Sequence, residues 1–353
     1  ELSFVLGFLL TAIPAFTHGE RCTGWELAGA VGGQILFGAL AFAGLEAASH
    51  AVFVITLLWL ATAAARRVRG AKLAPPEEFL FVAVGLALGL IGGAMQAGAA
   101  LGLWLEPVPR FGIRLVSLGM MLALVLGVGS MLVPVFAGLR DPLLLPGVAS
   151  AHERPGRRRL YVSLCSLLVL SFIADATLPP PAGEVVRLLF AATLALLGWK
   201  IWRLPGRTTL AAWALWVAGW MVLAGLVLAI VFPLNAVAFH HVIFIGGYGL
   251  LTLAIATRVV TGHGRHPLTD ESRLVTLPVV LFIGLAVALR VLAEFVPPTP
   301  HWLAASSVAW IAALLLWGAA ALPRIVRLAP PPPAGPMMVQ LAVKPPPNRA
   351  EAG

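Results

Sequence analysis

Charged side chains are scarce in this chain of 353 residues. Asp, Glu, Lys and Arg make up 11% of it, against roughly 25% in a typical soluble domain. Hydrophobic residues make up 60%, and the mean hydropathy is +0.95. A soluble protein of this size cannot hide so many apolar side chains, because its surface is too large for its mass. The shortage of charge therefore excludes a soluble globular enzyme and a disordered chain, and it predicts an all-α, polytopic transmembrane helical bundle.

Cysteine is also scarce, since Cys22 and Cys165 are the only two in the sequence. Two cysteines that lie far apart in the chain do not make a disulfide framework, so we expect both to be free thiols. The sequence also contains no GxxxxGK[ST], HExxH or CxxC pattern. A pump driven by nucleotide hydrolysis is therefore not indicated.

Long hydrophobic runs are what the sequence has in abundance. A spanning helix needs roughly 20 mostly apolar residues, and eleven runs approach or exceed this length. Proline, glycine or charge separates most of them, and the weakest break is the one at Glu46 between the second and third runs. The expected spans are 2–16, 25–45, 47–65, 79–104, 111–137, 160–176, 184–202, 209–231, 236–260, 273–295 and 301–321.

Two domains follow from this pattern. We expect a transmembrane domain over residues 1–322 and a Pro-rich, disordered cytoplasmic tail over residues 323–353. The chain opens at Glu1, directly inside a hydrophobic run. We therefore expect an N-terminally truncated fragment, whose full protein has about twelve spans.

Positive charge alternates between the loops. Of the 24 Lys and Arg residues, 20 fall in one set of alternate loops and the tail, three fall in the other set, and Arg290 lies within a span. Cytoplasmic loops carry the excess of Lys and Arg, so the chain is expected to be a multi-pass membrane protein with its C-terminus in the cytoplasm. The net charge of +9 then reflects cytoplasmic loops that are rich in arginine. We therefore expect the lipid bilayer as the partner of this chain, and no nucleic acid.

Histidines gather near the expected outer face. Four of the eight lie within about two helical turns of it: His50, His240, His241 and His301. Imidazole is a common ligand of copper and haem iron, and a bundle can build such a site from facing helices. Adjacent helical residues point about 100° apart, so His240 and His241 either line a cofactor site together or divide between internal packing and the membrane interface. His50 and His301 are weaker candidates, because each is equally compatible with an ordinary interfacial position.

Other polar or small residues near the outer ends of the spans allow two interpretations. Arg290 and Glu294 are spaced to form an i,i+4 ion pair, which we favour, although Arg290 is also placed to contact a haem propionate. Asp175 is expected at the membrane interface. The small residues Gly246 and Gly247 favour close helix packing, with room for a flat cofactor as the alternative.

Two stretches resemble one known family. The first is Gly7-Phe8-Leu9-Leu10-Thr11-Ala12-Ile13-Pro14, and the second runs from His241 through Arg258 to Gly262-His263-Gly264-Arg265. Both are similar to the NnrS family, multi-span bacterial membrane proteins that contain haem and copper and are linked to nitric oxide metabolism and nitrosative stress. The resemblance implies haem and copper as cofactors and makes His241 the best ligand candidate, with His240 beside it. Arg258, His263 and Arg265 match the family's later pattern.

Three functions remain open on this evidence. The first is a haem- and copper-binding protein that protects the cell from nitric oxide, with a redox partner as a further possibility. The second is a membrane oxidoreductase resembling haem-copper oxidases or nitric oxide reductases, which is less favoured because the sequence offers few other intramembrane histidines. The third is a metal-free transporter of small solutes, which is less favoured because the expected midplane is almost entirely apolar.

The charge alternation makes a testable prediction about topology. A reporter enzyme fused to the C-terminus is expected to be active in the cytoplasm, because the tail belongs to the set of segments that carries 20 of the 24 basic residues. Reporters fused after consecutive spans are expected to alternate in activity. Activity of the C-terminal fusion only in the periplasm would contradict the predicted orientation.

Overall fold

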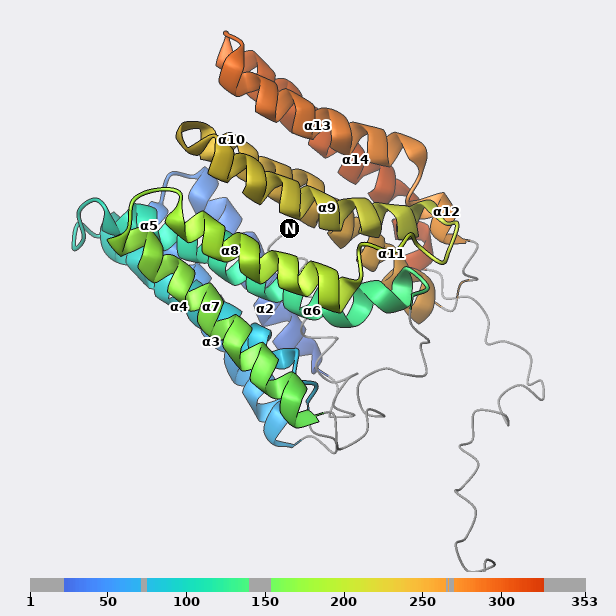
Figure 1. Cartoon of the computed structure of the whole chain (residues 1–353), viewed down its shortest axis with the longest axis horizontal. Coiled ribbons are helices and arrows are strands. Elements are labelled where there is room, and N and C mark those ends of the chain that lie inside the picture. The colour runs from blue at the N-terminus through green and yellow to red at the C-terminus, as the bar shows by residue number, and fades with distance from the viewer. Residues whose placement is uncertain (1–21, 71–74, 140–153, 265, 267–269, 327–353) are drawn as a thin grey trace, which may run out of the picture.

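The computed structural model describes residues 22–70, 75–139, 154–264, 266 and 270–326, and every regular element within these ranges is helical (Figure 1). The elements are α2 (Gly24–Phe42), α3 (Glu46–Arg69), α4 (Phe79–Ala100), α5 (Val108–Arg114), η1 (Leu115–Met120), α6 (Met121–Phe136), α7 (Arg154–Thr177), α8 (Ala182–Thr193), η3 (Leu194–Trp199), α9 (Leu210–Val231), η4 (Pro233–Asn235), α10 (Ala236–His241), η5 (Val242–Gly249), α11 (Leu250–His263), α12 (Glu271–Leu274), α13 (Leu277–Phe295) and α14 (Thr299–Val326).

Ten helical stretches in the described part of the chain are long and apolar enough to cross a membrane. They correspond to ten of the eleven spans expected from the sequence, and they confirm the all-α, polytopic helical bundle. The expected span 2–16 lies outside the described residues. The break expected at Glu46 is also present, because α2 ends at Phe42 and Gly44, at a φ of +74°, turns the chain before α3 begins.

The most deeply buried span joins α5, η1 and α6. All side chains of α6 from Met121 to Val135 are buried, so this helix lies inside the bundle and has no face left for lipid. The Trp199 indole packs against it, where its Nε1 donates a hydrogen bond to the Leu126 carbonyl oxygen at 3.2 Å. Helices α4 and η3 both pack on α6.

The last two spans differ from their expected bounds. The tenth begins at Leu277 and not at 273, because Val275 is extended and α12 forms a separate short helix before it. The eleventh continues through Pro323 to Val326, four residues beyond the expected end of the transmembrane domain. The remainder of the expected Pro-rich tail, residues 327–353, lies outside the described residues. Helices α13 and α14 pair with each other along one side of the bundle (Figure 1).

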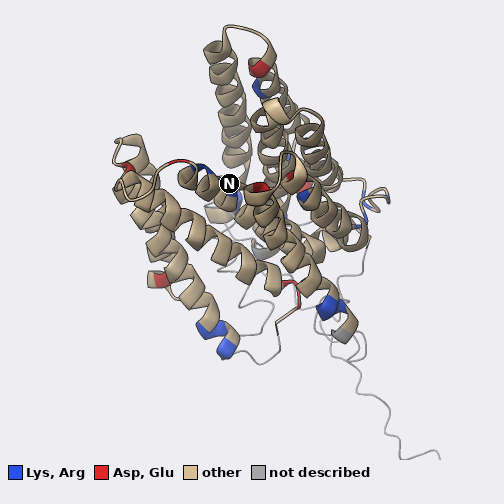
Figure 2. Cartoon of the chain, turned by 60° about the vertical axis from the view of Figure 1, so that its left-hand side comes forward, with Lys and Arg blue, Asp and Glu red and all other residues tan. Residues whose placement is uncertain are grey.

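Charge and apolar surface are segregated along the helices. Figure 2 shows most charged residues toward helix ends and connections, with long uncharged stretches between them. The outer faces of the peripheral spans carry exposed leucine, valine and isoleucine side chains, such as Leu281, Leu315 and Val308. This distribution is what a surrounding bilayer requires, because apolar side chains there are in contact with lipid and not with water.

The two glycines of η5 bring helices together. A Cβ atom added to Gly247 would lie 2.6 Å from Cγ2 of Val222 on α9, and one added to Gly246 would lie 2.2 Å from Cε of Met221. The neighbouring helix therefore fills the space that these glycines leave. The structure confirms close packing as the role of this pair and leaves no room beside them for a flat cofactor.

Substitution of Gly247 tests this packing. We expect Gly247→Ala to lower the free energy of unfolding by about 1–3 kcal/mol, because the added methyl group overlaps the β-branched Val222. The matched control is Gly284→Ala on α13, where an added Cβ meets no atom within 4 Å. Thermal unfolding of the purified variants in detergent provides the measurement. Equal midpoints for both variants would show that Gly247 is not needed for the approach of α9.

Candidate functional site

A cluster of ionisable side chains joins three spans at one end of the bundle. Asp175 lies near the end of α7, Glu184 and Arg187 lie in the first two turns of α8, and His240 lies on α10. Helix α8 packs against both α7 and α9, and α10 packs against α9, so these helices bring the four side chains to one place. This end of the bundle is the one that the charge pattern assigns to the outer face.

Arg187 is the centre of this cluster, and its side chain is fully buried. Its Nη1 and Nη2 donate to the two carboxylate oxygens of Asp175 at 2.8 and 3.0 Å, which is the bidentate geometry of a strong pair. Its Nε and Nη2 contact the two oxygens of Glu184 at 3.1 and 2.9 Å. The guanidinium also lies over the ring of Phe172, with 5.1 Å between its Cζ and the ring centroid. Two carboxylates and one aromatic face therefore enclose this cation.

Asp175 lies two residues before the end of α7, and protein surrounds its carboxylate. Its expected place at the membrane interface stays a prediction. Its side chain is 8% exposed and bridges the buried Arg187 and the half-exposed Arg114 of α5, which lies 3.7 Å away. A Cβ atom on Gly183 would lie 1.8 Å from Oδ1 of Asp175, so only glycine permits this approach of α7 to the start of α8. The buried carboxylate is stabilised because Arg187 neutralises its charge and Gly183 leaves space for it.

Glu184 connects this ion pair to the first histidine. Its Oε1 lies 2.9 Å from Nε2 of His240, and both side chains are mostly buried. An ionised carboxylate can only accept a hydrogen bond, so this contact places a ring proton on Nε2, and in the neutral imidazole Nδ1 then carries the lone pair. A carboxylate behind an imidazole is the arrangement that orients metal-ligating histidines.

His241 is held by its own helix. Its Nδ1 lies 2.7 Å from the carbonyl oxygen of Val237, one turn earlier. A carbonyl oxygen accepts only, so the proton is on Nδ1 and Nε2 carries the lone pair. The acceptor is therefore a backbone group of the same helix. The ring of Phe244 lies beside both imidazoles, with centroid distances of 6.3 Å to His240 and 5.8 Å to His241.

A π-helical segment begins directly after the histidine pair, at Val242, and continues to Gly249. The wider turn rotates the rest of this span relative to α10 and often occurs near functional sites. Sequence patterns do not predict this segment, because apolar periodicity alone does not distinguish π-helical from α-helical turns.

Arg290 does not form the ion pair that we favoured for it. Among the described residues it has no carboxylate within ion-pair distance, and Glu294 instead accepts a hydrogen bond from Nδ2 of Asn235 at 3.1 Å. An arginine that precedes a glutamate by four residues is in the weaker orientation for such a pair. Helix α13, which carries Arg290, packs against α10, which carries His240 and His241. Arg290 therefore belongs to the neighbourhood of the histidine pair.

The other two candidate histidines lie elsewhere. His301 is exposed at the start of α14, and His50 is half-buried on α3, a helix that packs against α2 and α4. In the part of the chain that the structure describes, no group of three or more His, Cys, Asp or Glu side chains is arranged to hold a metal ion. The structure thus brings together His240, His241 and Arg290 among the five expected cofactor-binding residues.

Two residues of the later family pattern, Arg258 and His263, lie on α11, away from the histidine pair. Arg258 of α11 forms an ion pair with the buried Glu271 of α12 and lies over the ring of Phe136. His263 is the last residue of α11, and Arg265 lies outside the described residues. Arg258 therefore has a structural role, because its ion pair fixes the end of this span to α12.

The two cysteines are free thiols, as expected from the sequence. Cys165 is buried within α7. Cys22 precedes α2, where burial raises the pKa of its thiol and so favours the protonated form. Neither environment provides the electropositive, exposed setting that makes a cysteine reactive.

Glu184 and Arg187 were not recognised as site residues from the sequence. The sequence shows their i,i+3 spacing and the apolar run that follows them, but it does not show that the two side chains are buried. The missing information was that Asp175 and His240, from two other spans, complete their contacts. Only the packing of α8 between α7 and α9 supplies it.

Removal of the central cation is expected to be costly. Arg187→Gln leaves Asp175 and Glu184 buried without their counter-charge, so we expect the free energy of unfolding to fall by about 3–5 kcal/mol. The matched control is Arg110→Gln, which removes an arginine whose side chain is 78% exposed and paired with Glu106. Exposed pairs contribute about 0–1 kcal/mol. Unfolding midpoints that fall equally for both variants would contradict the buried network.

The chain was compared with known proteins. A family model described as NnrS protein matches residues 2–328, which include all ten spans. No curated protein and no solved structure matches the chain. The family match agrees with the resemblance of the two sequence stretches and covers most of the chain. This multi-pass membrane protein therefore belongs to the NnrS family.

Proposed function

We propose that this protein binds haem or copper through His240 and His241 and acts in the response to nitric oxide or in protection from nitrosative stress. The observation that carries the proposal is the support of each imidazole by its own acceptor. Glu184 holds Nε2 of His240, and the Val237 carbonyl holds Nδ1 of His241. Metal-ligating histidines almost always have such a partner on the ring nitrogen that does not bind the metal.

The donor set fits part of such a site. Two neutral imidazoles suit copper or haem iron, and each presents one nitrogen with a free lone pair. The described residues supply these two nitrogens but no third His, Cys, Asp or Glu beside them that would complete a metal centre. A bound metal would supply the atom to which nitric oxide coordinates.

The surrounding residues have separate tasks in this proposal. Arg187 contacts both oxygens of Glu184, including the Oε1 atom that faces His240, so the carboxylate is fixed in place as the hydrogen-bond acceptor of the imidazole N–H. Arg290 lies on α13, which packs against the helix of the histidine pair, and it has no carboxylate partner among the described side chains, so it suits a carboxylate of haem. Helix packing through Gly246 and Gly247 keeps any flat group away from that stretch of η5.

Histidine substitutions test the assignment. We expect His241→Ala to lose bound haem or copper while the protein still inserts into the membrane. From the sequence, His240→Ala was expected to have the smaller effect. The contact with Glu184 now makes His240 an equal candidate, so we expect a loss for this variant as well. The measurements are the Soret absorption and the metal content per folded chain.

The control for these variants is His301→Ala, which removes an exposed histidine from the start of α14. We expect its absorption spectrum and metal content to equal those of the wild type. Unchanged spectrum and metal content in both His240→Ala and His241→Ala would show that this pair is not the ligand set. Steady consumption of nitric oxide or oxygen by the wild-type protein would instead favour the oxidoreductase hypothesis.

A further inference from the structure

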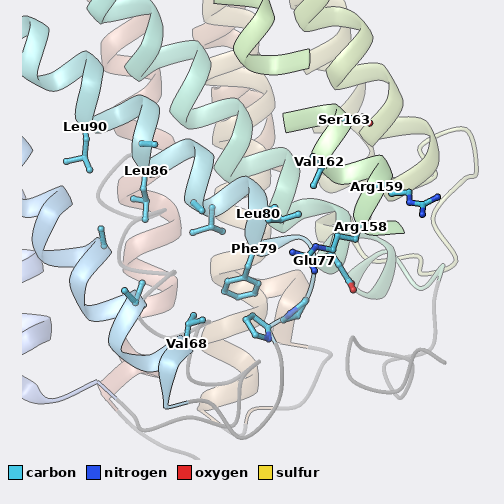
Figure 3. Close-up of a pocket in the computed structure, with 18 residues that line it drawn as sticks. Val68, Glu77, Phe79, Leu80, Leu86, Leu90, Arg158, Arg159, Val162 and Ser163 are labelled. Carbon is cyan, nitrogen blue, oxygen red and sulfur yellow. The ribbon is translucent and has the colours of Figure 1, made fainter. Parts of the chain in front are cut away.

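A large groove opens between three spans at the end of the bundle opposite the histidines. Its volume is about 1350 Å³, and it lies between the last turns of α3, the first half of α4 and the start of α7 (Figure 3). Alanines at positions such as Ala64, Ala83 and Ala87 leave the space, and Leu86 and Leu90 continue its apolar wall.

The groove has the depth of one lipid leaflet. Along α4 it extends from Phe79 to Leu90, and at 1.5 Å per residue this is about 16 Å. Half of the hydrocarbon core of a bilayer is about 15 Å thick. An acyl chain that enters from the polar end therefore fits the apolar wall along its length.

Positive charge lies at the polar mouth of the groove. Arg158 and Arg159 both line it, both are exposed, and neither forms an ion pair with a described residue. Their neighbour Arg157 differs, because it points inward and pairs with the buried Glu78. In Figure 3, Arg158 extends toward Glu77 across the mouth, while Arg159 extends outward from the rim.

Glu77 is the one acidic side chain among the residues that line the groove. Two arginines and one glutamate leave an excess of positive charge, and the exposed Arg69 at the end of α3 adds to it. This balance suits a headgroup that carries a phosphate and has no cation of its own.

We propose that this groove binds an anionic glycerophospholipid with the chemistry of phosphatidylglycerol. Arg158 and Arg159 hold the phosphodiester, and an acyl chain lies along α4 between α3 and α7. Basic pockets between spans recognise anionic headgroups by this combination of arginine and apolar wall. The site is separate from the histidine pair, and it does not depend on whether the protein carries a metal.

The charge part of the site is tested in nanodiscs of defined lipid. Full-length protein is exchanged into mixtures of phosphatidylcholine with phosphatidylglycerol, and the lipid retained per chain is measured by native mass spectrometry. Each arginine near a membrane surface contributes about 1 kcal/mol, so Arg158→Gln is expected to weaken retention of phosphatidylglycerol about fivefold and Arg158→Gln/Arg159→Gln about 30-fold. The control Arg273→Gln changes an arginine that is 72% exposed and does not line the groove, and no change is expected.

The apolar part needs its own variant. Ala87→Phe fills the groove without changing charge, and we expect it to reduce phosphatidylglycerol retention at least fivefold. Its control is Ala304→Phe, at an exposed alanine of α14 outside the groove. Thermal unfolding of each variant identifies folded protein, so that lost binding is not confused with lost structure.

Three results would overturn the proposal. The first is equal retention of phosphatidylglycerol by wild type and the double arginine variant. The second is an equal loss in Arg273→Gln, which would mean that general surface charge attracts the lipid. The third is weaker phospholipid retention by Glu77→Gln, together with preferential retention of phosphatidylethanolamine over phosphatidylglycerol. This result would mean that Glu77 pairs with a cation on the headgroup. Unchanged binding of phosphatidylglycerol by Glu77→Gln supports the anionic headgroup, as does retention that inorganic phosphate does not displace.

Discussion

A guanidinium without access to solvent has to be surrounded by its own counter-charges, and Arg187 imposes this requirement on three helices at once. Its partners Asp175 and Glu184 come from α7 and α8, and Glu184 extends the network to His240 on α10. A buried charge that loses its partner costs several kcal/mol, so each of these helices is constrained in depth and rotation by the same cation. The position of the first histidine is therefore a consequence of an ion pair in which it takes no direct part.

The same pattern occurs at the other end of the bundle, with different helices. Arg67 pairs with Glu26, Arg157 with Glu78, and Arg258 with Glu271, and in each pair the carboxylate is buried. Each pair joins a helix end to a neighbouring element, where backbone groups and charges lie close to the membrane surface. Lipid offers no hydrogen bonds, so polar contacts between spans supply the positional constraints that apolar packing alone lacks.

The sequence predicted the number and approximate positions of the described spans because the bilayer imposes a simple rule of length and hydrophobicity. Their ends were less predictable. The start of α13 at Leu277 depends on the extended Val275, and the length of α14 depends on a proline that the helix tolerates. The site was predicted only in part for a related reason. His240 and His241 stand out in the sequence as an unusual pair. The contact of Glu184 with His240 depends on tertiary packing, because α8 and α10 both pack against α9.

The span from Pro233 to Gly262 shows why a fixed scaffold matters for the histidine pair. Glu184 fixes one of its ends through His240, and Glu271 fixes the other through Arg258. Between these points the helix is mostly buried, and Gly247 lets it approach α9 more closely than a side chain would allow. A helix held in this way cannot easily rotate or slide. Binding groups need positions fixed to within about 0.5 Å, and supporting contacts on packed elements provide that precision better than loops do, so this span suits the ligand role proposed for the pair. The ion pairs at the two ends and the glycine contact thus all restrict the orientation of the two adjacent imidazoles.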